Sequence, residues 1–175
     1  MLKFTAALGL NVMAAPAEEQ FTSLPNNAEF TTNSYSGYLN VTETKSLHYV
    51  YVESQGDVKN DPVLLWFNGG PGCSSLLGFF QEHGPWVIDD FETDIKLNPF
   101  PWNLKANVLY LESPAGVGFS KSNNGTDLVQ NDMTQSEDAF IALQGWFKKF
   151  PERIGNPLWI SGESYGGIYV PYLSW

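Results

Sequence analysis

The chain has 175 residues, of which 43% are hydrophobic and 15% aromatic, and its formal net charge is -10. This length predicts one domain with a sizeable core, and the composition excludes an intrinsically disordered chain. The excess of 19 acidic over 9 basic residues argues against a nucleic-acid partner, because phosphate binding needs a basic surface.

Residues 1–17 have the pattern of a secretory signal peptide. Lys3 precedes the apolar stretch 4–10, and Ala15-Pro16-Ala17 is an A-x-A-like cleavage site. The stretch is too short to span a bilayer, and no later stretch does better. We therefore expect a mature chain from residue 18 onward, in the secretory pathway and without a membrane span.

A secretory location changes the interpretation of three residues. Asn40 and Asn124 each open an N-x-T sequon and become potential glycosylation acceptors. Cys73 is the single cysteine, and an unpaired cysteine in a secreted chain implies a missing partner. In a cytosolic protein the same residue would be a small buried side chain. The acidic charge also suits an acidic compartment, where partial protonation relieves self-repulsion.

The first half of the chain predicts a hairpin followed by a buried strand. Residues 36–41 and 47–53 alternate and carry Tyr and Val, which is typical of paired strands. Residues 62–67 are a continuous apolar run, which suits a strand buried on both faces. A glycine-rich loop at 68–72 ends this strand, and residues 74–83 are predicted to form a short helix.

In the second half, residues 89–107 are expected to form a loop region and residues 108–111 another buried strand. The strongest helix is predicted over 132–150, and a further strand at 157–160 leads to Ser164. Strands that alternate with helices in this order predict an α/β sheet whose later part is parallel. Ser164 would then lie at the carboxyl end of its strand, where open sheets bind ligands.

The predicted helix carries large apolar side chains at three- and four-residue spacing, which we expect to form its core-facing stripe. Thr134 and Glu137 have the spacing of a capping box at its start. The stripe is formed by Phe140, Leu143, Phe147 and Phe150.

The pentapeptide Gly162-Glu163-Ser164-Tyr165-Gly166 has the form G-x-S-x-G at a predicted strand-to-helix turn. This geometry presents a serine hydroxyl from a strained turn, ready to attack a carbonyl. Alone the pattern is weak, because it also fits a glycine-rich turn with a buried serine. Hydrolases of this kind place their acid and their histidine after the serine, and no histidine follows Ser164 here.

Three further motifs join this pentapeptide: the segment 66–75 (WFNGGPGCSS), the pairs Asn98-Pro99 and Trp102-Asn103, and the segment 112–120 (ESPAGVGFS). In this order they resemble the serine carboxypeptidases, an α/β-hydrolase family of lysosomes, vacuoles and secretions. The resemblance runs from about Ser34 to Leu173. It implies an α/β-hydrolase fold truncated after the nucleophile elbow, with residues 18–175 as the N-terminal part of the domain.

The resemblance also implies roles for individual residues. Ser164 would be the nucleophile that forms an acyl-enzyme. The backbone N–H groups of Tyr165 and Gly70 would form the oxyanion hole, at positions that supply these donors in this fold. Cys73 would pair with a distant downstream cysteine. The clamp for the carboxylate of a peptide C-terminus would comprise Asn68, the N–H of Gly69, Glu82 and Glu163.

The two glutamates have a physical interpretation of their own. Two carboxyls that share a site cannot both ionise cheaply, so one stays protonated to higher pH than an isolated carboxyl. A protonated Glu163 can donate a hydrogen bond to a substrate carboxylate, whereas an ionised one repels it. Such an enzyme would bind peptide C-termini best in acid. The alternative for Glu82 is a solvated residue on an exposed helix.

Other polar residues are weaker candidates. His48 and His83 both precede Ser164, and neither matches the family's catalytic histidine; His48 is expected on a strand face. Asp132 and Asp138 are interpreted as charges near the helix start, and Trp102 as a core residue. One cysteine and two histidines at no ligand-like spacing predict no metal site, and we expect no cofactor.

Three functions follow from the motifs. The first is a serine carboxypeptidase that acts on peptide or protein C-termini. The second is a catalytically inactive fragment that lacks the later acid and histidine. The third is an acyltransferase on the same scaffold, in which an alcohol replaces water. The residue preference at the scissile bond and the oligomeric state do not follow from these motifs.

Overall fold

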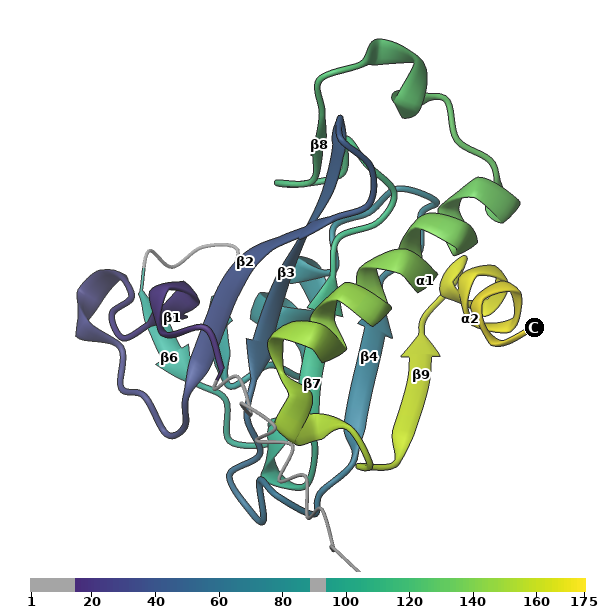
Figure 1. Cartoon of the computed structure of the whole chain (residues 1–175). Helices are drawn as coiled ribbons and strands as arrows, with labels where there is room; N and C mark the ends of the chain where they lie inside the picture. Colours follow the sequence, from purple (N-terminus) through teal and green to yellow (C-terminus); the bar gives the residue numbers. More distant parts are fainter. Residues whose placement is uncertain (1–14, 89–93) are drawn as a thin grey trace, which may run out of the picture.

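The computed structural model describes residues 15–88 and 94–175. Figure 1 shows a mixed sheet with helix α1 lying across one face. Within the described ranges the main sheet has seven strands in the order β1-β2-β3-β7-β4-β9, with β8 paired to β3. Its strands are β1 (Gln20–Phe21), β2 (Ser34–Asn40), β3 (Lys45–Val52), β4 (Val63–Phe67), β7 (Asn107–Leu111), β8 (Lys121–Ser122) and β9 (Leu158–Gly162).

The remaining elements are short except for two helices. A second, two-stranded sheet pairs β5 (Trp86–Ile88) with β6 (Ile95–Leu97). The two α-helices are α1 (Asp132–Lys149) and α2 (Gly166–Ser174). The short helices are η1 (Ala17–Glu19), η2 (Pro25–Asn27), the π-helical η3 (Gly78–Glu82), η4 (Trp102–Leu104), η5 (Gly125–Leu128) and η6 (Pro151–Arg153).

The sheet changes character at β7. Strands β1, β2, β3 and β7 pair antiparallel, whereas β7, β4 and β9 run parallel. This confirms the α/β class with a parallel later part. Because parallel strands end at the same edge, the loops after β4, β7 and β9 meet there (Figure 1).

The core has two parts, one on each face of the sheet. On one face α1 and Tyr169 of α2 cover the sheet, and on the other Phe79 of η3 and Trp86 do so. Side chains of β3 alternate between the two parts, as the period of a strand requires. Tyr49 and Tyr51 face α1, and Val50 faces η3.

The predicted stripe of α1 is partly wrong. Phe140 is 52% exposed, whereas Leu143 and Phe150 are buried and Phe147 is partly buried. The face that packs on the sheet is built instead around small residues and one large ring: Ala139, Ala142, Leu143, Trp146 and Phe150. Small residues let the helix lie close to the sheet, and aromatic spacing alone could not reveal this.

The start of α1 also differs from the prediction. The capping residue is Asn131, whose side chain accepts the N–H of Thr134 at 3.0 Å, while the Thr134 hydroxyl accepts the N–H of Asn131. Glu137 has no part in this capping box. Asp138 is a buried residue rather than a helix-start charge, and it forms an ion pair with Lys45 Nζ at 2.7 Å. Asp132 does lie in the first turn.

Three other predictions need correction, and a fourth falls mostly outside the described residues. The helix expected over 74–83 is shorter, and the loop expected over 89–107 contains β6 and η4. Trp102 is 46% exposed, although its ring stacks on that of His83 with centroids 4.0 Å apart. Most of the predicted signal peptide, 1–14, lies outside the described residues. Across those described, no helix combines the length and apolarity that crossing a membrane requires.

Candidate active site

Ser164 lies between β9 and α2 in a backbone conformation that serine rarely adopts. Its φ is +51°, in the left-handed region, and its side chain is exposed. The flanking glycines are required by close approach: a Cβ on Gly162 would lie 2.7 Å from the carbonyl oxygen of Phe67. A Cβ on Gly166 would lie 3.1 Å from the same oxygen. This strained, exposed turn is the geometry expected of a nucleophile elbow.

The loop after β4 lies directly against this turn. A Cβ on Gly69 would lie 2.5 Å from the backbone nitrogen of Tyr165 and 2.9 Å from Ser164 Cβ. Gly70 has a φ of +109°, which favours glycine because a side chain there would be strained. The structure thus brings both predicted oxyanion segments beside the serine.

Asn68 holds the two predicted clamp glutamates together. Its Nδ2 donates to Glu82 Oε1 and to Glu163 Oε1, each at 2.9 Å. Its Oδ1 accepts the indole N–H of Trp66 at 2.8 Å and the N–H of Gly78 at 2.9 Å. Because both groups at Oδ1 are donors, the amide can point only one way. Asn68 itself is buried, and both glutamates are exposed, so their carboxylates face solvent beside Ser164.

Neither histidine of the chain is placed to act as the base for Ser164. Both ring nitrogens of His48 are engaged, with Ser36 and Glu112. His83 lies at the end of η3, where Nδ1 meets the hydroxyl of Tyr110 at 3.1 Å and Nε2 is buried without a hydrogen-bond partner. Burial lowers the pKa of His83 to about 4, so its ring is neutral. His48 lies on strand β3, as predicted.

Glu112 is a buried carboxylate that sequence reasoning noted only as part of a motif. Its Oε1 accepts from the hydroxyl of Ser74, and its Oε2 accepts the N–H of Phe119 at 2.9 Å. Burial alone would raise its pKa, but hydrogen bonds from His48, Ser74 and Phe119 outweigh burial and lower it. Glu112 therefore ties the loop after β7 to the loop after β4. The available signal for Glu112 was an acidic residue directly after the apolar run 108–111 of β7.

Two tyrosines support the elbow from the helix side. The hydroxyl of Tyr165 donates to Asp132 at 3.1 Å, which links the elbow to the start of α1. The hydroxyl of Tyr169 accepts the N–H of Gly72 at 3.1 Å, which links α2 to the loop after β4. Burial raises the pKa of Tyr169, so it stays protonated. Cys73 is exposed and free in this loop.

Comparison with known proteins identifies the family. A serine carboxypeptidase family profile matches residues 25–175. The "Lysosomal protective protein" of Mus musculus is 50% identical over 162 residues, which cover 92% of this chain and 34% of the relative. "Serine carboxypeptidase-like 21" of Arabidopsis thaliana is 45% identical over 167 residues, with the same two shares. The chain spans about a third of the length of these relatives.

A solved structure agrees with the sequence relatives. The prohormone-processing carboxypeptidase Kex1 of Saccharomyces cerevisiae superposes with a TM-score of 0.68 at 26% identity, over 82% of this chain and 33% of that protein. The fold is therefore of the α/β-hydrolase type, as expected from the elbow and the parallel strands. With this fold, the elbow and a family profile that covers most of its residues, the chain belongs to the serine carboxypeptidase family.

Proposed function

We propose that this chain carries the nucleophile, the oxyanion donors and the carboxylate clamp of a carboxypeptidase. Ser164 attacks the last peptide bond of a substrate and forms an acyl-enzyme. The N–H groups of Gly70 and Tyr165 stabilise the oxyanion as it develops. The free C-terminal carboxylate is held by the Gly69 N–H, Asn68 and the two glutamates.

The observation that carries this proposal is the bridge from one amide to two carboxyls. Asn68 Nδ2 holds Glu82 and Glu163 at 2.9 Å each, and Glu163 adjoins the strained Ser164. The substrate of an endopeptidase presents no free carboxylate at this place, so paired acidic groups would have nothing to bind there. In a carboxypeptidase they must be protonated to bind a carboxylate, because ionised ones repel it. A protonated glutamate that donates to a terminal carboxylate selects peptides that end there.

The 175-residue chain alone is expected to turn over slowly. Deprotonation of Ser164 requires a base, and both histidines are engaged or buried elsewhere. An oxyanion hole without the base leaves roughly 10³-fold catalysis over water. Serine-dependent turnover at ordinary enzyme rates by the chain alone, lost in Ser164→Ala, would contradict this.

Two finer assignments belong to the same proposal. Acyl transfer to an alcohol uses the same acyl-enzyme as hydrolysis, so the acyltransferase alternative is tested by adding an alcohol and measuring the ester formed.

We also place the protein in the secretory pathway, as a lysosomal, vacuolar or secreted protein. Support comes from the signal-peptide pattern, from exposed Asn40 and Asn124 in their sequons, and from the name of the mouse relative.

A chimera tests the activity. Residues 25–175 replace the matching segment of the mouse lysosomal protective protein, which supplies the remaining length. We expect release of C-terminal residues from a blocked peptide, and little action on the matching C-terminal amide. Equal cleavage of both, or cleavage at internal bonds, would overturn the clamp.

Glu163→Gln in the chimera sharpens the test. Glutamine donates a hydrogen bond at every pH, so KM for the peptide should rise less steeply from pH 4.5 to pH 7.5 than in the parent. The effect should lie mainly in KM, because the carboxylate is held in both ground and transition states. The C-terminal amide is the matched control and should show no such difference. An equally steep rise in both enzymes would remove Glu163 from the clamp.

A further inference from the structure

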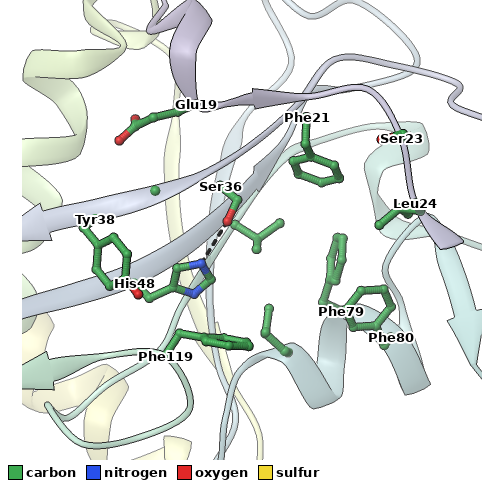
Figure 2. Close-up of a pocket in the computed structure, with 13 residues that line it drawn as sticks. Glu19, Phe21, Ser23, Leu24, Ser36, Tyr38, His48, Phe79, Phe80 and Phe119 are labelled. Carbon is green, nitrogen blue, oxygen red and sulfur yellow. Dashed lines mark hydrogen bonds between the residues drawn. The ribbon is translucent and has the colours of Figure 1, made fainter.

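Ser36, which lies away from the elbow, is hydrogen-bonded to a histidine, whereas Ser164 is not. Ser36 lies on β2 and His48 on β3, and the register pairs Tyr38 with His48 and Ser36 with Val50. Residues 36 and 48 therefore share one face of the hairpin. The Ser36 hydroxyl lies 2.9 Å from His48 Nε2 (Figure 2). His48 Nδ1 lies 2.9 Å from Glu112 Oε2.

The direction of these hydrogen bonds follows from Glu112. Its side chain is fully buried, and its carboxyl is held in the ionised form by the donors around it. An ionised carboxylate only accepts, so Nδ1 of His48 carries the proton and donates it. In the neutral ring Nε2 is then an acceptor, and the Ser36 hydroxyl donates to it. The three residues have the order and spacing of a nucleophile, a base and an orienting acid.

The serine faces a cavity of about 700 Å³, within the size range of small-molecule sites. His48 is buried, while Ser36 is only partly covered and can be reached from the cavity. Figure 2 shows Ser36 near the middle of the lining residues, with Tyr38, His48 and Phe119 toward one side and Phe21, Phe79 and Phe80 toward the other. Its apolar lining comes from Phe21, Leu24, Val50, Leu76, Phe79, Phe80 and Phe119.

We propose that Ser36, His48 and Glu112 form a second acyl-accepting site, which takes apolar acyl groups from activated esters. Ser36 Oγ forms a bond to the acyl carbon, and its proton passes to His48 Nε2. The bond from the acyl carbon to the leaving phenolate oxygen breaks, and the phenolate departs. The site shares no residue with the carboxypeptidase clamp or elbow, so it stands or falls independently of the proposed function.

The choice of activated esters follows from the backbone. Ser36 lies within a regular strand, whereas the non-glycine residues with positive φ in the described ranges are Asn26 and Ser164. Ser36 therefore lacks the strained turn of an elbow, and a good leaving group must make up for this. The aromatic walls favour a medium-length alkyl chain over an acetyl group, because burial of each CH₂ contributes about 0.8 kcal/mol.

The test uses the monomeric, folded 175-residue chain with Ser164→Ala and the ester p-nitrophenyl octanoate. Release of p-nitrophenolate and peptide mass mapping should show one octanoyl group on Ser36. Ser46, on the neighbouring strand, is the internal control, because its hydroxyl bonds to Asn40 and has no imidazole partner. p-Nitrophenyl acetate should acylate Ser36 at least tenfold more slowly than the octanoate.

Variants test two features independently: the hydrogen-bonded relay of Ser36, His48 and Glu112, and the apolar cavity. Ser36→Ala should remove the acylation, and His48→Gln should slow it about 100-fold, the lower end of general-base contributions. Leu24→Trp leaves the relay intact but narrows the cavity, so it should slow octanoate and spare acetate. It keeps the test decisive even where a buried histidine variant fails to fold. Equal octanoyl on Ser36 and Ser46, none on Ser36, or an unchanged rate in the folded His48 variant would each overturn the proposal.

Discussion

Strands β7 and β9 flank β4 on either side, run parallel to it and are both rich in apolar residues, yet the fold covers them very differently. Every residue of β7 is buried, whereas on β9 Trp159 is 63% exposed and Leu158 is 39% exposed. The difference lies in their neighbours: β7 pairs with β3 and β4, and β9 pairs within the described sheet with β4 alone. Apolar sequence favours a strand, but the number of neighbours decides its burial.

The residues that follow these strands differ in the same way. β7 leads to Glu112, which is fully buried and bonded to three donors, and β9 leads to Ser164, which is exposed and strained. One end anchors two loops, and the other presents a hydroxyl to solvent. We therefore expect changes after β7 to affect stability and changes after β9 to affect chemistry.

The largest expected effect is on activity. In the chimera, Ser164→Ala should lower kcat by about 10⁴-fold or more, since loss of a nucleophile removes nearly all triad catalysis. Its free energy of unfolding should change by less than about 0.5 kcal/mol, because the side chain is exposed. Kinetics on a blocked peptide and urea unfolding measure the two quantities. A large loss of stability would break the contrast between the two ends.

Glu112→Ala should show the reverse pattern in the 175-residue chain. Removal of the carboxylate leaves the N–H of Phe119, the Ser74 hydroxyl and the His48 ring without their acceptor. A lost partner of a buried charged group costs about 3 kcal/mol or more. Urea unfolding followed by tryptophan fluorescence gives the change. A cost below about 0.5 kcal/mol, as expected of an exposed surface residue, would show that Glu112 does not anchor the two loops.

A smaller effect is expected from pH, through His83. Its pKa is about 4 in the folded chain, against an ordinary value of 6.5, so the unfolded chain binds more protons between these values. Stability should be flat above pH 6.5 and fall as the pH drops toward 4, by on the order of 2 kcal/mol. The lowered pKa of Glu112 adds a further loss at lower pH, as its carboxylate protonates.

His83→Phe is the matched variant for this pH dependence. Phenylalanine keeps the ring between Trp66 and Trp102 but cannot bind a proton. Its free energy of unfolding should change much less between pH 6.5 and pH 4.5 than that of the parent. If both chains lose stability equally over this range, the acid sensitivity comes from another group.

The smallest effect on stability is expected at the exposed edge. Trp159→Lys places a charge on β9, and charged side chains protect edge strands from pairing with another chain. Stability should change by less than about 0.5 kcal/mol, while size-exclusion chromatography should show more monomer. Phe100→Lys removes an 81% exposed ring away from this strand and is the control. An equal gain in monomer from both variants would assign the association to exposed rings in general.

The sequence alone determined the class of the fold and most of the candidate active site. Apolar runs of four to six residues mark the buried strands, and the glycines around Ser164 and Asn68 mark the two loops that must approach closely. These signals are local, because strand period and glycine geometry depend on neighbouring residues. Four motifs in order were then enough to indicate the family.

Only the tertiary structure decided which side chains meet across distant segments. The face of α1 that packs on the sheet could not be predicted, because fit against the sheet selects small residues over the exposed Phe140. Asn68 bridges Glu82, which is 14 residues further along the chain, and Glu163, which is 95 residues further along. The relay of Ser36, His48 and Glu112 depends on the pairing of β3 with both β2 and β7. No local pattern encodes such contacts, because strand order sets them and the whole chain sets strand order.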